Sequence, residues 1–363
     1  MVSSSDLIIA AMSGGVDSSI TAACLKESGH NVVGITLKVW EKPEGLESSN
    51  TSCCGLDGIN DAKRVAELLR INHYVLNAKG AFKRSVVDYF TNEYVKGRTP
   101  NPCVLCNQVL KFDFLFAQGK KFGATKVATG HYARVGEFRG YPVIKKGLDP
   151  AKDQSYFLFS IASNRLGDIF FPVGNMKKTA VREMARKLGL NTADKADSQE
   201  ICFVPDNDYK SFIRQMEDIK NITEGDIVDE QDNIVGKHTG YIDYTVGQRR
   251  GLGISNPYPL YVVKIDHTNN RLIVGGKLSQ YNKGLIADGL NWHVPLEVTR
   301  NLEVTARIRS RHMAAPAQIT PRDKDSIVVE FETAQMSITP GQAVVFYHGD
   351  VVLGGGWIKD KLY

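Results

Sequence analysis

A glycine-rich turn between a strand and a helix constrains this chain more than any other segment. Residues 13–19 have the sequence Ser-Gly-Gly-Val-Asp-Ser-Ser, between an apolar run at 7–12 and a helical pattern at 20–28. Adjacent glycines let the backbone approach a ligand without a Cβ in the way, and the amides that open a helix face an anion. The pattern predicts a phosphate-binding loop, with an ordinary glycine turn as the alternative. Four side chains could serve phosphate or metal oxygens: Ser13, Asp17, Ser18 and Ser19.

The usual nucleotide-binding fingerprints do not occur at this loop. It lacks the Gly-Lys-Ser/Thr ending of a Walker loop, and no Gly-x-Gly-x-x-Gly follows the first apolar run. The loop resembles the PP-loop of the ATP pyrophosphatases, which holds the β and γ phosphates of ATP. Those enzymes cleave between the α and β phosphates and produce an adenylated substrate. The resemblance implies ATP and Mg²⁺ as cofactors.

Length and composition narrow the class of protein. A chain of 363 residues suits two or three domains, and 42% hydrophobic with 23% charged residues is ordinary for a globular protein. No apolar run is long enough to span a membrane, and the first residues lack the pattern of a signal peptide. We therefore expect a cytoplasmic protein with no membrane partner. The net charge of +5 permits a local basic face but does not establish nucleic-acid binding.

The first half of the chain alternates strand and helix patterns. Strands are predicted at 32–39, 73–76 and 126–129, and helices at 60–69, 82–96 and 113–121. This alternation predicts an α/β fold with a parallel sheet, whose ligands bind beyond the carboxyl ends of the strands. The loop after residue 12 and the segment 129–131 would both lie there. The polar segment 43–58 is a candidate mobile loop over the same place.

The pattern changes near residue 207. From there glycines recur between β-branched runs at 261–265, 271–274, 326–332 and 343–348, which is typical of an all-β barrel or sandwich. We expect domains at 1–206, 207–278 and 279–363. These are a PP-loop catalytic domain, a small β-rich central domain and a C-terminal β-barrel that binds tRNA, the last role resting on the resemblance given below.

The six cysteines need an explanation that suits a reducing compartment. Cys103 and Cys106 follow a proline-bounded turn and can face one site, whereas Cys202 is distant in sequence. A Cys-x-x-Cys pair can hold zinc, hold an iron–sulfur cluster or act as a redox pair, and the second pair needed for zinc is missing. Burial in a helix accounts for Cys24. The adjacent Cys53 and Cys54 lie in a polar segment and are interpreted as incidental.

Blocks along nearly the whole chain resemble one family. They are the PP-loop and the segments 97–102, 128–133, 152–158, 198–203, 244–254 and 340–342, and their order and spacing are similar to those of the tRNA-specific 2-thiouridylases. That family adds sulfur to the wobble uridine of certain tRNAs.

The resemblance implies roles for particular residues. ATP would be held by Ala11, Met12, Ser13, Gly14, Gly15, Val16, Asp17 and Ser18, with Leu37 and Gly130 on the adenine and ribose side. Cys202 matches the cysteine that carries sulfur as a persulfide, and Cys106 matches the second catalytic cysteine. In that mechanism the uracil 2-oxygen is adenylated, sulfur from Cys202 attacks the carbon, and Cys106 releases the product by forming a Cys106–Cys202 disulfide.

Cys103 departs from the family pattern, in which an aspartate is common and has been assigned as a general acid/base. A thiol does not inherit that role directly. The departure also gives the chain three cysteines, Cys103, Cys106 and Cys202, that could ligate an iron–sulfur cluster with one open iron. A persulfide mechanism and a cluster mechanism therefore both remain open.

The alternation of Arg307, Arg309 and Arg311 predicts a row of cations on one face of a strand, with a solvated edge strand as the alternative. The resemblance adds further contacts to tRNA or its target base: Asn101, Pro102, Cys103, His131, Lys152, Asp153, Gln154, Arg309, Ser310 and Gln342. It also implies the tRNAs for Lys, Glu and Gln as partners, and a sulfur donor such as a cysteine desulfurase or a relay protein.

Two other functions compete with this hypothesis. A PP-loop amide synthetase acting on a small molecule would need neither Cys106 nor Cys202. A non-catalytic tRNA-binding protein could use ATP as a structural ligand only, but Asp17 and the two cysteines argue against it.

Overall fold

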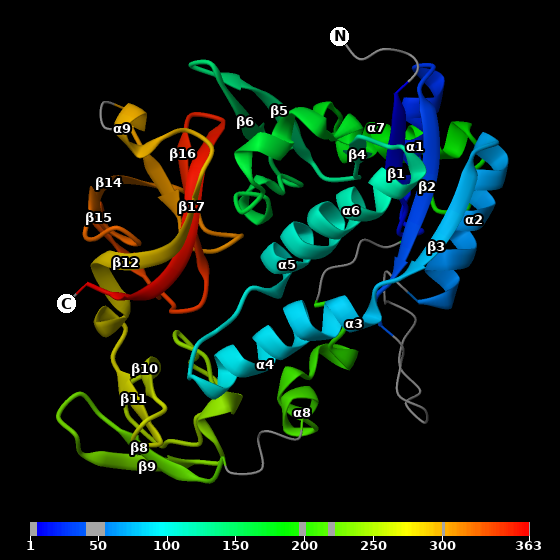
Figure 1. Cartoon of the computed structure of the whole chain (residues 1–363). Coiled ribbons are helices and arrows are strands. Elements are labelled where there is room, and N and C mark those ends of the chain that lie inside the picture. The colour runs from blue at the N-terminus through cyan, green and yellow to red at the C-terminus, as the bar shows by residue number, and fades with distance from the viewer. Residues whose placement is uncertain (1–5, 41–54, 196–200, 217–221, 300–301, 363) are drawn as a thin grey trace.

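The computed structural model describes residues 6–40, 55–195, 201–216, 222–299 and 302–362. A parallel sheet with the order β3-β2-β1-β4-β7 organises the N-terminal part (Figure 1). Because β1 lies between β2 and β4, the winding direction reverses at its carboxyl end, where α/β sheets bind their ligands. The strands are β1 (Leu7–Ala11), β2 (Asn31–Lys38), β3 (Asn72–Asn77), β4 (Lys126–Ala128) and β7 (Ile169–Phe170).

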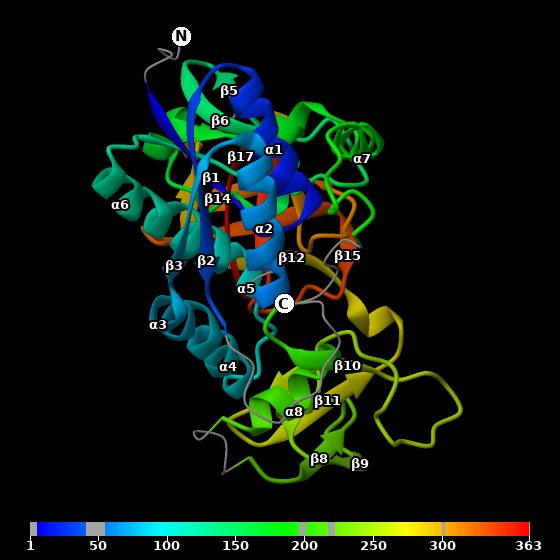
Figure 2. The same ribbon diagram turned by 90° about the vertical axis from the view of Figure 1, so that its right-hand side faces the viewer.

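The two faces of this sheet bury alternate residues, as the pleat requires. Ile8 and Ala10 pack with α1 (Val16–Glu27), α2 (Leu56–Leu69) and α7 (Lys178–Lys187), whereas Ile9 packs against residues 112–116 on the opposite face. Figure 2 shows α1 and α2 in front of the strands. The α/β fold with a parallel sheet that the sequence predicts is confirmed.

Two long helical runs cover the rest of the sheet and its lower end. One contains α3 (Lys79–Phe82), a π-helical segment at Lys83–Val87 and α4 (Asp88–Val95). The other contains α5 (Pro102–Leu105), a π-helical segment at Cys106–Phe114, and α6 (Leu115–Gly119). The helix predicted at 113–121 thus begins too late, because Pro102 already opens the helix at its first turn, where a missing N–H costs nothing. The helical run therefore contains Cys103 and Cys106.

The C-terminal strands form a closed barrel, because β12 pairs with both β15 and β17. Its strands are β12 (Tyr281–Trp292), β13 (Thr305–Arg307), β14 (Ala315–Pro321), β15 (Ser326–Met336), β16 (Ala343–His348) and β17 (Val351–Lys361). A hairpin from the N-terminal part, β5 (Ala133–Phe138) and β6 (Tyr141–Lys146), extends the same sheet through β17. The sequence patterns did not indicate this hairpin.

A smaller sheet of order β10-β11-β8-β9 lies between the two larger parts in sequence. Its strands are β8 (Gly225–Val228), β9 (Ile234–His238), β10 (Tyr261–Asp266) and β11 (Arg271–Gly275), and short helices α8 (Tyr209–Arg214) and α9 (Leu296–Thr299) precede and follow it. No helix among the described residues combines the length and apolar character needed to cross a membrane.

Candidate active site

The glycine loop joins β1 to α1 in the conformation that its sequence predicts. Gly14 has φ +75°, and a Cβ there would lie 2.1 Å from the carbonyl oxygen of Gly58 in α2. The Ser13 amide donates to Ser18 Oγ over 3.2 Å, and Ser18 Oγ donates to the Gly15 carbonyl over 2.9 Å. These bonds shape the loop before any ligand binds. The first N–H groups of α1 have no carbonyl partner within the helix, so they can receive an anion.

Gly130 packs on this loop from the end of β4, and Leu37 lies on β2, the strand on the other side of β1. A Cβ on Gly130 would lie 2.7 Å from backbone atoms of Asp17 and Ser18, so the segment after β4 packs directly on the first turn of α1. Leu37 lies near the carboxyl end of β2 and contacts two buried clusters. The described part of the predicted loop 43–58 already belongs to α2 from Leu56 onward. Residues 43–54 lie outside the described residues, and so do Cys53 and Cys54.

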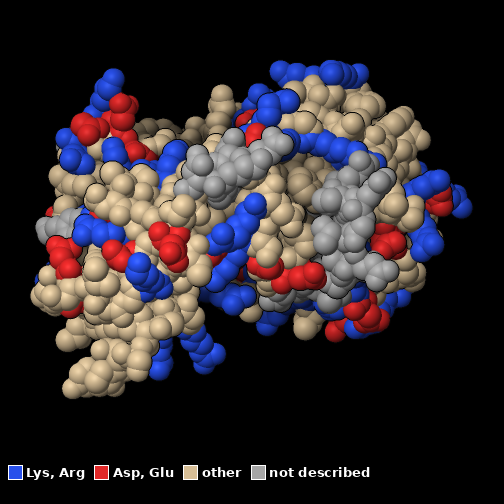
Figure 3. Space-filling view, turned by 90° about the horizontal axis from the view of Figure 1, so that it is seen from below, with Lys and Arg blue, Asp and Glu red and all other residues tan. Residues whose placement is uncertain are grey.

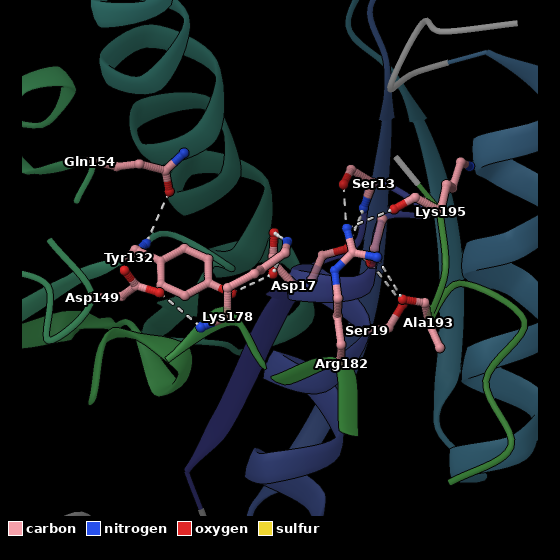
Figure 4. A network of polar contacts seen from close by, with 12 residues as sticks. Ser13, Asp17, Ser19, Tyr132, Asp149, Gln154, Lys178, Arg182, Ala193 and Lys195 are labelled. Carbon is pink, nitrogen blue, oxygen red and sulfur yellow. Dashed lines mark hydrogen bonds and ion pairs between the residues drawn. The ribbon is translucent and has the colours of Figure 1, made fainter. Parts of the chain in front are cut away.

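Asp17 has a cationic partner that the sequence did not suggest (Figure 4). Lys178, at the start of α7, places its ammonium 2.8 Å from both carboxylate oxygens, and Tyr132 donates its hydroxyl to the same group over 2.7 Å. Lys178 is only 7% exposed. No local motif marks this lysine, which is the first residue of the amphipathic helix α7. The loop therefore contains a partly buried ion pair at the place where phosphate is expected.

A second lysine ties the loop to the chain that leads towards Cys202. Lys195 Nζ donates to the Gly14 carbonyl over 3.2 Å and to Asp61 over 2.9 Å (Figure 4 shows Lys195 beside the loop). Arg182 on α7 donates to the carbonyls of Ala193 and Lys195. These bonds fix the chain after α7 beside the phosphate loop as far as Lys195.

Cys106 and Cys202 border the same buried cluster, although 96 positions separate them in the sequence. Cys106 opens the π-helical segment, and Cys202 lies in a turn beside Phe203. The Phe203 ring packs edge-on against Phe82 and Phe90, with centroids 5.4 and 5.3 Å away, which fixes the backbone next to Cys202. Both cysteines are half-buried, whereas Cys103 is exposed. Leu37 contacts this cluster too.

The structure also places Cys24 and bears on the hypothesis of a metal site. Cys24 is in α1, and burial raises the pKa of its thiol, as expected of an unreactive structural cysteine. Among the described residues no three His, Cys, Asp or Glu side chains are arranged to hold a metal. Cys103, Cys106 and Cys202 are thus not grouped as one metal site within the described part of the chain.

His131 is buried and locked by its neighbours. Its Nδ1 contacts Thr129 Oγ1 at 2.6 Å, and its Nε2 contacts Asn107 Oδ1 at 3.2 Å. Asn107 in turn donates to the Phe157 carbonyl, which assigns Nε2 as the protonated nitrogen. Burial lowers the pKa of His131 well below its usual range, and the charge of Lys111 lowers it further. The ring is therefore neutral, and it holds the residue that follows Cys106.

The prediction that Arg307, Arg309 and Arg311 form a row on one face of a strand is wrong. The strand β13 ends at Arg307, and residues 308–312 form turns in which Ile308 is buried. Arg307 points inward: its guanidinium is 3.0 Å from Asp153, and it donates to the carbonyls of Ser310 and His312. Alternation by two requires a continuing strand, and these bonds to its own downstream carbonyls turn the chain instead.

The segment 152–154 and Gln342 have structural partners. Asp153 accepts hydrogen bonds from the amides of Gly147 and Ser155, and Gln154 Oε1 accepts the Tyr132 amide over 2.9 Å. Gln342 donates to the carbonyls of Thr99 and Pro100, just before the buried Asn101 and Pro102. Lys152 and Arg309 are half-buried.

We expect Arg307→Met to lower the free energy of unfolding by about 3 kcal/mol, because it leaves the buried Asp153 carboxylate without its cation. Arg309→Met, two residues away, removes one bond to the Met336 carbonyl and should cost less than about 1 kcal/mol. Urea unfolding of both variants measures the difference. Equal stability of the two variants would contradict the structural role of Arg307.

Three family models together match most of the chain. They are described as a tRNA methyl transferase HUP domain over residues 6–206, a tRNA methyl transferase PRC-barrel domain over 210–276, and an aminomethyltransferase beta-barrel domain over 282–358. The tRNA-specific 2-thiouridylase MnmA of Geotalea uraniireducens (strain Rf4) is 49% identical over 361 residues, covering 97% of this chain and 94% of that protein. MnmA 1 of Caldanaerobacter subterraneus subsp. tengcongensis is 48% identical, with 98% of each chain covered.

A solved structure of the U34-tRNA thiolase NcsA from Methanococcus maripaludis, with its [4Fe-4S] cluster, is 17% identical over 60% of this chain and 75% of that one. Its TM-score of 0.34 is too low to carry an argument about this site. The parallel sheet and the loop after β1 define a PP-loop protein of the α/β class. With nearly full-length matches at 49% and 48% identity, the chain belongs to the tRNA-specific 2-thiouridylase family.

Proposed function

We propose that this protein catalyses the ATP-dependent 2-thiolation of the wobble uridine of tRNA in the cytoplasm, with the tRNAs for Lys, Glu and Gln as substrates. The observation that carries the proposal is that Cys106, Cys202 and Leu37 border one buried cluster. The two cysteines, far apart in the sequence, border a cluster that Leu37 of β2 also contacts, and β2 pairs with the strand that leads into the phosphate loop. Transfer of sulfur to an ATP-activated base requires both cysteines on the side of the ATP site. The full-length similarity to named 2-thiouridylases supports the same conclusion.

ATP would lie with its phosphates on the amides of residues 13–18 and its adenosine towards Leu37 and Gly130. Mg²⁺ would neutralise the phosphate oxygens. Asp17 is paired with Lys178 in this structure, so it becomes a metal ligand only when Lys178 moves onto a phosphate, for which a lysine ammonium is well suited. We therefore assign Lys178 to the ATP site together with the residues expected from the sequence.

The chemistry assigned to this site has three bond-forming steps. The uracil 2-oxygen attacks the α-phosphorus of ATP and releases pyrophosphate. The terminal sulfur of a persulfide on Cys202 then attacks C2, and AMP leaves with the oxygen. The Cys106 thiolate attacks Cys202 Sγ, so the bond between that sulfur and the transferred sulfur breaks and its electron pair stays on thiouridine. The resulting disulfide must be reduced by a thiol before the next turnover.

The sulfur would come from a cysteine desulfurase or a relay protein that transfers a persulfide to Cys202. These steps use Cys202 and Cys106 alone, and no step is routed through an iron–sulfur cluster. For tRNA contacts we retain the set Asn101, Pro102, Cys103, His131, Lys152, Gln154, Arg309 and Ser310. We assign Asp153 and Gln342 to positioning, since each already holds backbone groups of an adjacent loop.

The test is to incubate the purified protein with tRNA, ATP, Mg²⁺ and a persulfide donor, and to digest the tRNA for mass spectrometry. We expect 2-thiouridine at the wobble position and AMP in equal amounts. Formation of AMP with ammonia and a small carboxylic acid, without tRNA, would favour an amide synthetase. Binding of tRNA with neither AMP nor thiouridine would favour a non-catalytic binding protein.

A further inference from the structure

A small basic pocket lies where the three parts of the chain meet. Its volume is about 170 Å³, and its walls come from the end of α4, from β10 and from the end of β17. Segments near residues 97, 264 and 360 thus share one concave surface. None of these residues was singled out as a ligand above.

Cationic side chains dominate the lining: Lys96, Arg98, Lys264, Lys359 and Lys361. Asp360 lines the pocket as well, and Glu93 lies behind it as a shared partner of Lys96 at 3.1 Å and Arg98 at 3.6 Å. Lys359 is 3.7 Å from Asp288. The carboxylates therefore offset only part of the positive charge.

Lys361 is a buried lysine in the wall of this pocket. It is 5% exposed and donates its ammonium to the Val263 carbonyl over 2.8 Å. Burial lowers the pKa of Lys361 and the charge of Lys264 lowers it further, whereas Asp360 and Glu230 act in the opposite direction. Within the described part of the chain the hydrogen bond of this buried ammonium goes to a neutral carbonyl, so an anion in the pocket would stabilise its charge.

The wall of the pocket is fixed by close packing, and the chain continues from it into α5, which contains Cys103. Gly97 has φ +68°, and a Cβ there would lie 2.9 Å from Ile265 on β10, so the turn packs closely on the small sheet. The Thr99 amide donates to the Pro340 carbonyl over 2.9 Å, which fixes the turn to the barrel. The chain then enters α5 at Pro102. An anion beside Arg98 is thus held at a fixed place relative to Cys103 and Cys106.

Bulk charge does not reveal this pocket. On the face shown in Figure 3, basic and acidic side chains are interspersed, so that face carries no uniform basic surface. The pocket concentrates cations over a volume that suits a single phosphate group, with apolar contacts from Val246, Ile265 and Pro340.

We propose that this pocket binds one backbone phosphate of the RNA substrate and so sets the position of the RNA relative to the Cys103–Cys106 turn. The proposal rests on the proposed function, because it assumes that RNA is the substrate. Free phosphate or pyrophosphate offers the same chemistry, and the experiment separates the two sources.

The test compares Lys264→Gln/Lys359→Gln with Lys63→Gln/Lys324→Gln, a control pair of exposed lysines on α2 and on the barrel. Dissociation constants for tRNA are measured over a range of NaCl concentrations. The pocket variant should bind several-fold more weakly at low salt, and its log–log salt slope should fall by about 0.7 to 0.9, the change that the loss of one phosphate contact produces. The control pair should retain the wild-type slope, and ATP affinity should be unchanged in both.

An unchanged slope in the pocket variant, with wild-type tRNA binding intact, overturns the proposal but leaves the proposed function standing. No tRNA binding by the wild-type protein refutes the proposed function itself. Inorganic phosphate or pyrophosphate could instead bind the wild-type protein and fail to bind the pocket variant, while the salt slope for tRNA stays unchanged. This result would assign the pocket to a free anion and would also overturn the proposal. Should the double variant unfold, Lys264→Gln alone gives the same comparison with a slope change of at most about 0.9.

Discussion

Replacing Cys202 with serine should abolish 2-thiouridine formation, by about 10⁴-fold or more, the scale seen when a nucleophile is lost from covalent catalysis. A serine hydroxyl cannot form the sulfur–sulfur bond that carries the incoming sulfur. Activation of the base should continue, because the phosphate loop does not involve Cys202. Mass spectrometry of digested tRNA and release of pyrophosphate in a single turnover measure the two steps separately.

Cys106→Ser should stop the reaction one step later. The transferred sulfur would remain bonded to both C2 of the base and Cys202, so a covalent protein–tRNA adduct should accumulate and be released by a thiol reductant. Cys24→Ala is the matched control, because Cys24 is buried in α1 with a raised thiol pKa. Full thiolation by Cys106→Ser or Cys202→Ser would refute the assignment of the cysteines.

Cys103 separates the two sulfur-transfer routes. In the persulfide route Cys103→Asp retains turnover, because it restores the residue common in the family. A cluster route requires Cys103 as a ligand, so the variant would lose both activity and anaerobically reconstituted iron.

Asp17→Asn should reduce pyrophosphate release by about 10² to 10³-fold, the scale of removing one charge-stabilising group from an active site. The amide keeps the shape and can still accept the Tyr132 hydroxyl, but it no longer neutralises Lys178. Affinity for tRNA should change little, because Asp17 lies at the phosphate loop. Pyrophosphate release at the wild-type rate would exclude Asp17 from catalysis.

The double variant Asp17→Asn/Lys178→Met distinguishes catalysis from stability. The single Asp17→Asn change leaves a mostly buried ammonium without its carboxylate, which we expect to lower the free energy of unfolding by about 2 kcal/mol. This is less than a fully buried pair would lose, because the Asp17 side chain is 30% exposed. Adding Lys178→Met should restore stability but not pyrophosphate release. Recovery of both would make the pair purely structural.

Local patterns were enough to predict most of the architecture. The strands at 343–348 and 261–266 and the helix after the glycine loop follow from β-branched runs and helical periodicity, which each segment carries by itself. The β5–β6 hairpin was missed although its own pairing is local; what only the fold decides is that β6 joins the barrel through β17, about two hundred residues later. The domain limits, the tRNA acceptors and the sulfur donor stay predictions.

The sequence by itself determined the phosphate loop, because two adjacent glycines, the hydroxyls and the strand–helix boundary lie within a few residues of one another. It also marked Cys106 and Cys202 through their flanking residues. Only the tertiary structure decided that these cysteines border one buried cluster, that Lys178 pairs with Asp17, and that Arg307 turns inward to Asp153. Each of these contacts joins residues about a hundred or more positions apart. Such pairs form when whole sheets and helices pack, and no local spacing encodes which distant side chain will supply the partner for a buried charge.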